Sequence, residues 1–156
     1  YVDPKRVAAA GYSWGAMAGL FASSRSIANT LVPGERPAAV VSFYPGCFTL
    51  RPNATYSYEL VREDIDRPLL VLMGGEDTET PPKDCQDKLG PLQAAGAPVE
   101  MHLYSAATHC WDCRTLDGFR KKDFRGTDVV YRFDREVTDD SARRMFEFIE
   151  RSFGKP

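Results

Sequence analysis

Apolar residues gather along the chain in four short runs, and glycine, proline or polar residues follow each run. The runs cover residues 6–12, 38–46, 68–77 and 98–105. The second and third are almost continuously apolar, as strands buried on both faces of a sheet are, whereas the fourth alternates apolar and polar residues like an edge strand. The pattern therefore predicts four strands.

Helix-forming segments alternate with these strands. Helices are expected over residues 14–24, 82–96 and 138–153. The second should be interrupted at Gly90-Pro91, because proline lacks the backbone N–H that a helix uses. The third carries apolar side chains three and four positions apart, and Thr138 is its expected N-cap.

This alternation predicts one α/β domain over residues 1–156, with a mostly parallel sheet flanked by helices. Residues 47–66 and 106–137 are expected to be irregular surface segments. The 20 basic and 22 acidic residues leave a formal net charge of -2, so no nucleic-acid partner is expected. No apolar run approaches the roughly 20 residues of a membrane span, so no membrane partner is expected either.

A serine between two glycines carries the strongest chemical signal. Gly11-Tyr12-Ser13-Trp14-Gly15 fits the pattern G-x-S-x-G and lies between a predicted strand and a predicted helix. The glycines permit a tight turn that exposes the Ser13 hydroxyl, and the Trp14 N–H at the helix start can stabilise an oxyanion. The pattern indicates a nucleophile, although a Gly-Ser turn without chemistry remains the alternative.

A serine hydroxyl needs a base to take its proton, and histidine has a suitable pKa. The chain has 2 histidines. His102 lies within a predicted strand, where a structural role is expected. His109 follows that strand in a loop, so we expect it to be the base.

A carboxylate should orient this histidine, and Asp77 follows a buried strand and two glycines. The competing carboxylates are Glu76, Glu79, Asp84 and Asp112. The chain order Ser13, Asp77, His109 is the order of a hydrolase whose triad residues each follow a strand. Asp77 is therefore the predicted acid, with Glu76 as its solvated neighbour.

Several segments together resemble the dienelactone hydrolase family of the α/β-hydrolase fold. They are "RVAAAGYSWGAMAG", "LLVLMGGEDTETPPKDC", "VEMHLYSAATHCWD" and "VVYRFDREVTDDSARRMFEFI". The resemblance implies that Ser13 is the nucleophile, Asp77 the acid and His109 the base. Dienelactone hydrolases proper carry cysteine at the nucleophile position, so Ser13 favours a general carboxylic-ester hydrolase over the dienelactone substrate.

The resemblance also implies that several strands precede residues 6–12, and that a loop after one of them supplies a second oxyanion donor. The chain is therefore expected to be the C-terminal portion of a hydrolase domain, lacking the N-terminal strands. Residues 6–12 would then form an open sheet edge. A separate N-terminal fragment or a second copy of the chain is the expected partner along this edge.

Four cysteines leave a further set of alternatives. Cys110 and Cys113 have C-x-x-C spacing, for which a thiol-redox or metal role is the rival to a local disulfide. Cys47 and Cys85 are the other candidate pair. At least one disulfide is expected, and two would indicate an exported protein rather than a cytoplasmic one.

Aromatic residues near the predicted site suggest a substrate pocket. The candidates for its lining are Trp14, Phe48, Trp111 and Phe119, with Trp111 the predicted substrate-binding residue. A basic group could attract an acidic substrate, although a solvated charge run is the simpler interpretation: Arg114, Arg120, Lys121 and Lys122. The predicted function is hydrolysis of small esters or lactones through an acyl-enzyme, with no cofactor or metal. The alternative is a catalytically impaired module that binds or assembles.

Overall fold

A four-stranded parallel sheet forms the centre of the computed structural model, which describes residues 2–31, 34, 36–51 and 53–154. The strands are β1 (Ala8–Tyr12), β2 (Ala39–Phe43), β5 (Leu69–Gly74) and β6 (Val99–Tyr104). They lie in the order β1-β2-β5-β6, and each neighbouring pair is parallel. The four predicted strands and the parallel sheet are confirmed.

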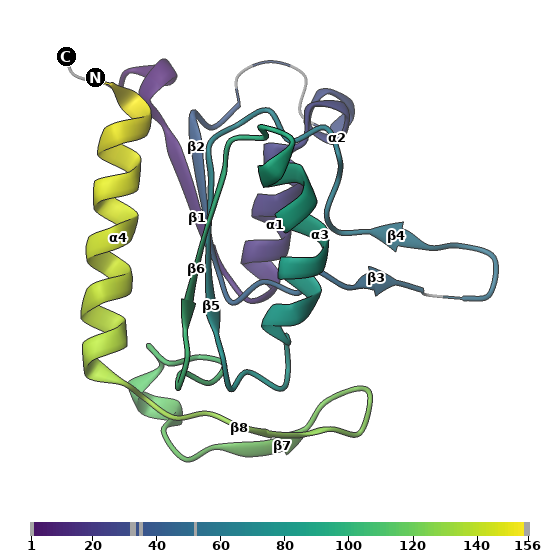
Figure 1. Cartoon of the computed structure of the whole chain (residues 1–156), viewed down its shortest axis with the longest axis vertical. Helices are drawn as coiled ribbons and strands as arrows, with labels where there is room; N and C mark the ends of the chain where they lie inside the picture. The colour runs from purple at the N-terminus through teal and green to yellow at the C-terminus, as the bar shows by residue number, and fades with distance from the viewer. Residues whose placement is uncertain (1, 32–33, 35, 52, 155–156) are drawn as a thin grey trace.

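Helices cover both faces of this sheet (Figure 1). The helix α4 (Arg135–Phe153) packs on one face, and α1 (Trp14–Ser23) and α3 (Pro82–Ala94) pack on the other. Because successive strand residues point to opposite faces, Val40 joins the core beneath α1 and α3 while Val41 joins the core beneath α4. The short α2 (Arg25–Leu31) follows α1 and was not predicted.

Two details of the predicted helices are wrong. The helix α3 continues through Gly90 and Pro91 without interruption. Buried Leu89 and half-buried Leu92 pack against the core on either side of this pair, so tertiary contacts hold the last turn. The N-cap of α4 is Asp134, whose carboxylate accepts a hydrogen bond from the Val137 N–H. Thr138 lies inside the first turn.

The structure also contains two antiparallel hairpins and two short 3-10 helices that were not predicted. One hairpin pairs β3 (Thr49–Leu50) with β4 (Tyr58–Glu59), and the other pairs β7 (Arg120–Lys122) with β8 (Asp128–Val130). The 3-10 helices are η1 (Pro4–Arg6) and η2 (Arg114–Leu116). In Figure 1 the β7–β8 hairpin runs below the carboxyl ends of the sheet strands, where catalytic groups of such sheets collect.

The strand β1 is the outermost strand on one side of the sheet, as the sequence predicted for an open edge. Its residues are partly buried or exposed, whereas all residues of β2 are buried. Within the described part of the chain, β1 pairs only with β2. Among the helices in that part, none has the length and apolar content that a membrane crossing requires.

Both predicted cysteine pairs are at disulfide distance. Cys47–Cys85 is buried and ties the segment after β2 to α3. Cys110–Cys113 closes a half-buried four-residue loop directly after His109. Two bonded pairs point to an oxidising environment.

Candidate active site

The turn between β1 and α1 holds Ser13 in a strained backbone conformation. Its φ is 50° and its ψ is -114°, a region that non-glycine residues rarely occupy. The turn brings Gly11 against the backbone of Gly15, so that a Cβ added at Gly11 would lie 2.3 Å from the Gly15 carbonyl oxygen. Such strain is characteristic of residues whose side chain is held for a function.

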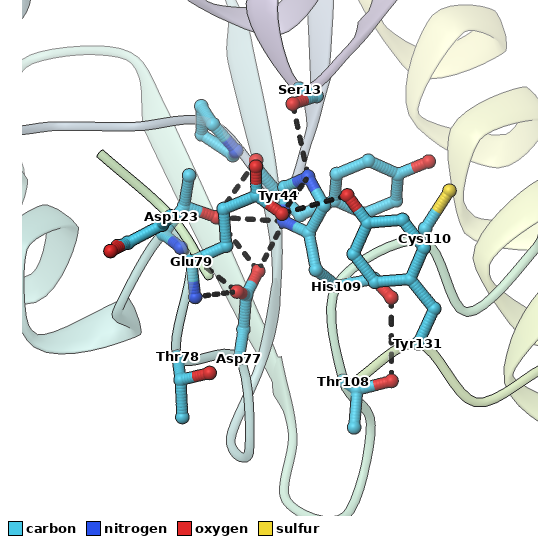
Figure 2. A network of polar contacts seen from close by, with 12 residues as sticks. Ser13, Tyr44, Asp77, Thr78, Glu79, Thr108, His109, Cys110, Asp123 and Tyr131 are labelled. Atoms are coloured by element: carbon cyan, nitrogen blue, oxygen red, sulfur yellow. Dashed lines mark hydrogen bonds and ion pairs between the residues drawn. The ribbon is translucent and has the colours of Figure 1, made fainter. Parts of the chain in front are cut away.

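Ser13, His109 and Asp77 come together at the carboxyl ends of β1, β6 and β5 (Figure 2). Nε2 of His109 lies 2.9 Å from the Ser13 hydroxyl, and Nδ1 lies 2.7 Å from Oδ2 of Asp77. These contacts fit the tautomer in which Nδ1–H donates to Asp77 and Nε2 accepts from Ser13. The structure therefore brings together the three residues that the sequence nominated from separate segments.

Asp77 is held by several donors besides the histidine. Its Oδ1 accepts hydrogen bonds from the backbone N–H groups of Glu79 at 2.9 Å and Thr80 at 2.8 Å. The Thr80 hydroxyl lies 2.7 Å from Oδ2. Because Asp77 and His109 are both buried, this network fixes the carboxylate and the imidazole in one arrangement.

Two tyrosine rings flank the imidazole. The ring of Tyr44 lies 4.5 Å from that of His109 between centroids, and the ring of Tyr131 lies at 5.6 Å. Tyr44 donates its hydroxyl to Asp112 at 2.6 Å, and burial followed by this hydrogen bond raises the pKa of Tyr44. Tyr44 thus stays a neutral donor beside the histidine.

A second carboxylate, Glu79, lies on the serine side of the imidazole. Its Oε2 is 3.9 Å from Nε2 of His109 and accepts a hydrogen bond from Tyr131 at 2.7 Å. Its Oε1 pairs with Lys121 at 2.7 Å. Burial alone would lower the pKa of Lys121, but hydrogen bonds to Glu79 and Tyr131 outweigh it and raise that pKa.

The other competing acids lie elsewhere. Glu76 is exposed and pairs with Arg132, as expected for a solvated neighbour. Asp112 is the acceptor for Tyr44, and Asp84 lies in the first turn of α3. The geometry therefore favours Asp77 as the partner of His109.

His102 lies on β6, away from this cluster. Its ring contacts that of Tyr104 at 4.5 Å in an edge-on arrangement. Burial, followed by the charge of Arg144, lowers the pKa of His102. This placement agrees with the structural role expected for it.

The expectation that Trp111 binds substrate is wrong. Trp111 is fully buried, packs against Phe43 and Tyr44, and donates its indole N–H to Ser141 at 3.3 Å. Its ring lies in the core beneath α4. Trp111 therefore supports Tyr44 from behind.

Of the other predicted pocket residues, Trp14 and Phe48 line a cavity of about 180 Å³ that includes Ser13. Phe119 packs against Tyr131 and does not line it. Sequence reasoning missed Met17 and Phe124, which do line it. The i, i+4 spacing from Ser13 to Met17 on a helix was the available signal for the first. No comparable signal existed for Phe124, because its position depends on the unpredicted β7–β8 hairpin.

Among the residues that the structure describes, one group of side chains has metal-ligand composition, namely Cys110, Asp112 and Cys113. The two sulfur atoms are joined to each other, so they offer no thiolate to a metal ion. The disulfide instead closes a loop in which Cys110, the residue after His109, has a φ of 60°.

Comparison with protein families gives one match that covers most of the chain. The family model described as "Dienelactone hydrolase family" matches residues 1–153. The chain belongs to the dienelactone hydrolase family. Family membership agrees with the parallel sheet flanked by helices. Comparison with curated proteins finds no significant relative.

Solved structures show the same fold. The carboxylesterase Cest-2923 from Lactobacillus plantarum WCFS1 has a TM-score of 0.66 and 14% identity, covering 99% of this chain and 62% of that chain. The dienelactone hydrolase-like promiscuous phosphotriesterase P91 from metagenomic libraries has a TM-score of 0.64 and 20% identity, with 98% and 55% covered. MGS-M1, an α/β hydrolase from a Medee basin deep-sea metagenome library, has a TM-score of 0.62 and 22% identity, with 95% and 56% covered.

These similarities establish an α/β-hydrolase fold. They also show that the chain spans between 55% and 62% of these three structures. The described part of the chain includes the strands that carry Ser13, Asp77 and His109.

Proposed function

We propose that the protein hydrolyses carboxylic esters or lactones through a Ser13-His109-Asp77 triad and an acyl-enzyme. The observation that carries the proposal is the contact chain from the Ser13 hydroxyl through His109 to buried Asp77, with distances of 2.9 and 2.7 Å. Nucleophile, base and orienting acid within hydrogen-bond reach are the arrangement that activates a serine.

In the first half of the reaction the Ser13 oxygen attacks the ester carbonyl carbon, and its proton passes to Nε2 of His109. Asp77 stabilises the imidazolium that forms and holds Nδ1 in the correct tautomer. His109 then gives the proton to the leaving alkoxide, which departs as the alcohol. Water attacks the acyl-enzyme in the second half, with His109 again taking and returning a proton.

The developing oxyanion needs hydrogen-bond donors. Trp14 is the first residue of α1, where backbone N–H groups have no partner within the helix. We assign its N–H to the oxyanion, assisted by the dipole of α1. We propose that a second donor comes from a segment that pairs beside β1. Of the two expected partners, a separate N-terminal fragment would supply this donor and a second copy of the chain would not.

We also propose an exported protein, since two disulfides persist in oxidising compartments. Cys47–Cys85 and Cys110–Cys113 support this. The rival function, a module that binds or assembles without catalysis, is favoured by the open β1 edge and disfavoured by the complete contact chain at Ser13. The thiol-redox rival has less support, because Cys110-x-x-Cys113 lies in a loop and opens only the three-residue η2.

The test is turnover of p-nitrophenyl acetate by the purified protein and four variants. Ser13→Ala and His109→Ala should each lower kcat by roughly three or more orders of magnitude, because the two groups act as a unit. Asp77→Asn should lower it comparably, while the neighbouring Glu76→Gln should change it by less than about twofold, as loss of an exposed ion pair does.

Circular dichroism of each variant serves as the control for folding. Near-normal turnover in Ser13→Ala would end the serine-hydrolase proposal. A large loss in Glu76→Gln with none in Asp77→Asn would move the acid by one residue.

A further inference from the structure

The cavity beside Ser13 has one apolar side and one charged side. Its volume is about 180 Å³. The apolar lining residues are Trp14, Met17, Phe48 and Phe124. The charged lining residues are Glu79, Lys121, Lys122 and Asp123. The two sides would favour different chemical groups of a substrate.

Two phenylalanine rings from distant segments meet on the apolar side. Phe48 follows β2 and Phe124 lies in the turn of the β7–β8 hairpin, with 5.8 Å between their ring centroids. Gly46 makes room for this wall, since a Cβ there would lie 2.4 Å from the Phe48 ring and 2.5 Å from the Met17 methyl group. The absence of a side chain at Gly46 therefore leaves space for the Phe48 ring and the Met17 methyl group.

Much of this apolar surface faces solvent next to the nucleophile. Trp14 is 66% exposed and Phe124 is 75% exposed. Large aromatic side chains gain free energy when they leave water, and exposed groups of them mark binding sites. The hairpin that carries Phe124 is itself anchored, because Arg125 donates to the backbone oxygens of Thr78 and Glu79 at 3.0 and 2.9 Å.

The charged side chains are already paired with one another or with neighbours. Lys121 pairs with Glu79 at 2.7 Å, and Lys122 pairs with Asp128 at 2.8 Å. Asp123 pairs with Arg125 at 2.8 Å and also accepts hydrogen bonds from two backbone N–H groups of its own turn. Because each lysine is already offset by a carboxylate, the charged side offers a substrate carboxylate little net positive charge.

We propose that this cavity binds an uncharged aromatic ring of the ester, stacked against Phe48 and Phe124, in preference to a substrate that carries a free carboxylate. The inference rests on the proposed function. An apolar cavity of about 150 Å³ holds one benzene molecule, so a volume of about 180 Å³ has room for one ring. A bound ring would lie within the 4.5–7 Å at which aromatic rings attract one another.

Steady-state kinetics with a small set of esters tests this directly. Methyl phenylacetate carries its ring on the acyl side, benzyl acetate carries it on the alcohol side, ethyl acetate has no ring, and monomethyl succinate has a carboxylate. At least one ring ester should exceed ethyl acetate in kcat/KM. Phe48→Ala and Phe124→Ala should each lower the ratio of the ring ester's kcat/KM to that of ethyl acetate by roughly 3- to 10-fold. This factor corresponds to the free energy of one aromatic pair.

Phe146→Ala is the matched control, because Phe146 is 61% exposed on α4 and does not line the cavity. It should leave the ratio unchanged. A ratio that stays the same in both Phe48→Ala and Phe124→Ala overturns the inference, as does faster turnover of monomethyl succinate than of both ring esters.

Binding of N-benzylacetamide, an uncharged and slowly hydrolysed ring compound, separates the ring site from catalysis. Saturation-transfer NMR should show ring contacts with the wild-type protein and with Ser13→Ala, and their loss in Phe124→Ala. Ring binding without turnover of any ester would support the ring site and reject the proposed function. Ester turnover with neither ring preference nor N-benzylacetamide binding would do the reverse.

Discussion

Thr80 contributes a hydroxyl at the junction of the acid and the base. This oxygen lies 2.7 Å from Oδ2 of Asp77, 3.1 Å from Nδ1 of His109 and 3.1 Å from the Tyr44 carbonyl oxygen. The side chain is buried, so these contacts have no competition from bulk water. Thr80 acts through Asp77 and His109 and is a positioning residue.

Replacing Thr80 by valine keeps the shape and removes the hydroxyl. We expect kcat to fall by roughly 5- to 100-fold, the cost of leaving a buried carboxylate oxygen short of one donor. Thr80→Ser keeps the hydroxyl and should retain most of the rate. A pH–rate profile provides the second readout, since its shape should change in Thr80→Val and not in Thr80→Ser. Equal rates and profiles for the two variants would rule out positioning by Thr80.

At the scale of elements, the turn from β1 to α1 determines whether Ser13 is presented. The two glycines of G-x-S-x-G have different surroundings. A Cβ at Gly11 would lie 2.3 Å from the Gly15 carbonyl oxygen, whereas a Cβ at Gly15 would meet no heavy atom within 4 Å. Only the first glycine is required by contacts within the described part of the chain.

Gly11→Ala should therefore disrupt the turn, with a lower Tm and most of the esterase rate lost. Gly15→Ala should fold normally, because alanine is favoured over glycine within a helix by roughly 1 kcal/mol. Thermal unfolding and esterase assays on both variants provide the comparison. If the two substitutions cost the same, the glycines act through something other than the Gly11–Gly15 contact.

Elements with strong periodicity were predictable, and elements fixed by distant contacts were not. The apolar runs around Val40 and Val71 predicted buried strands, because a continuous apolar run indicates burial on both faces whichever strands lie beside it. The β7 strand consists of Arg120, Lys121 and Lys122. This run of charged residues has no hydrophobic alternation, so the sequence did not indicate its pairing with β8. Proline at position 91 predicted a break that core packing overrides.

The site shows the same division. Ser13, Asp77 and His109 were predictable because each follows its own strand, and the carboxyl ends of parallel strands meet at one edge of the sheet. Trp111 was misassigned because its closeness to His109 in sequence gave no hint that α4 would bury it. Phe124 was missed because only the hairpin brings it to Phe48.

At the scale of the whole molecule, the exposed edge of β1 has the largest consequence. Tyr12 is 45% exposed, Val7 just before the strand is 42% exposed, and the strand contains neither proline nor charge. Unpaired backbone groups on such an edge recruit another strand.

We therefore expect the chain alone not to be a stable, active monomer. Light scattering should show association, and Ala10→Lys should reduce it, because Ala10 is exposed on β1 and lysine discourages edge pairing. Ala94→Lys, at an exposed position in α3, is the control and should leave association unchanged. A monomer with full esterase activity would contradict the importance of this edge.

The central claim is that Ser13 is an activated nucleophile, and covalent labelling tests it most directly. A fluorophosphonate reacts with an activated serine by forming a phosphorus–oxygen bond and expelling fluoride, so it does not depend on the choice of ester. Peptide mass spectrometry should find one label, on Ser13, that is absent from Ser13→Ala and forms far more slowly in His109→Ala and Asp77→Asn. An unlabelled Ser13 in folded protein, or labelling that proceeds equally fast in His109→Ala, would contradict the account.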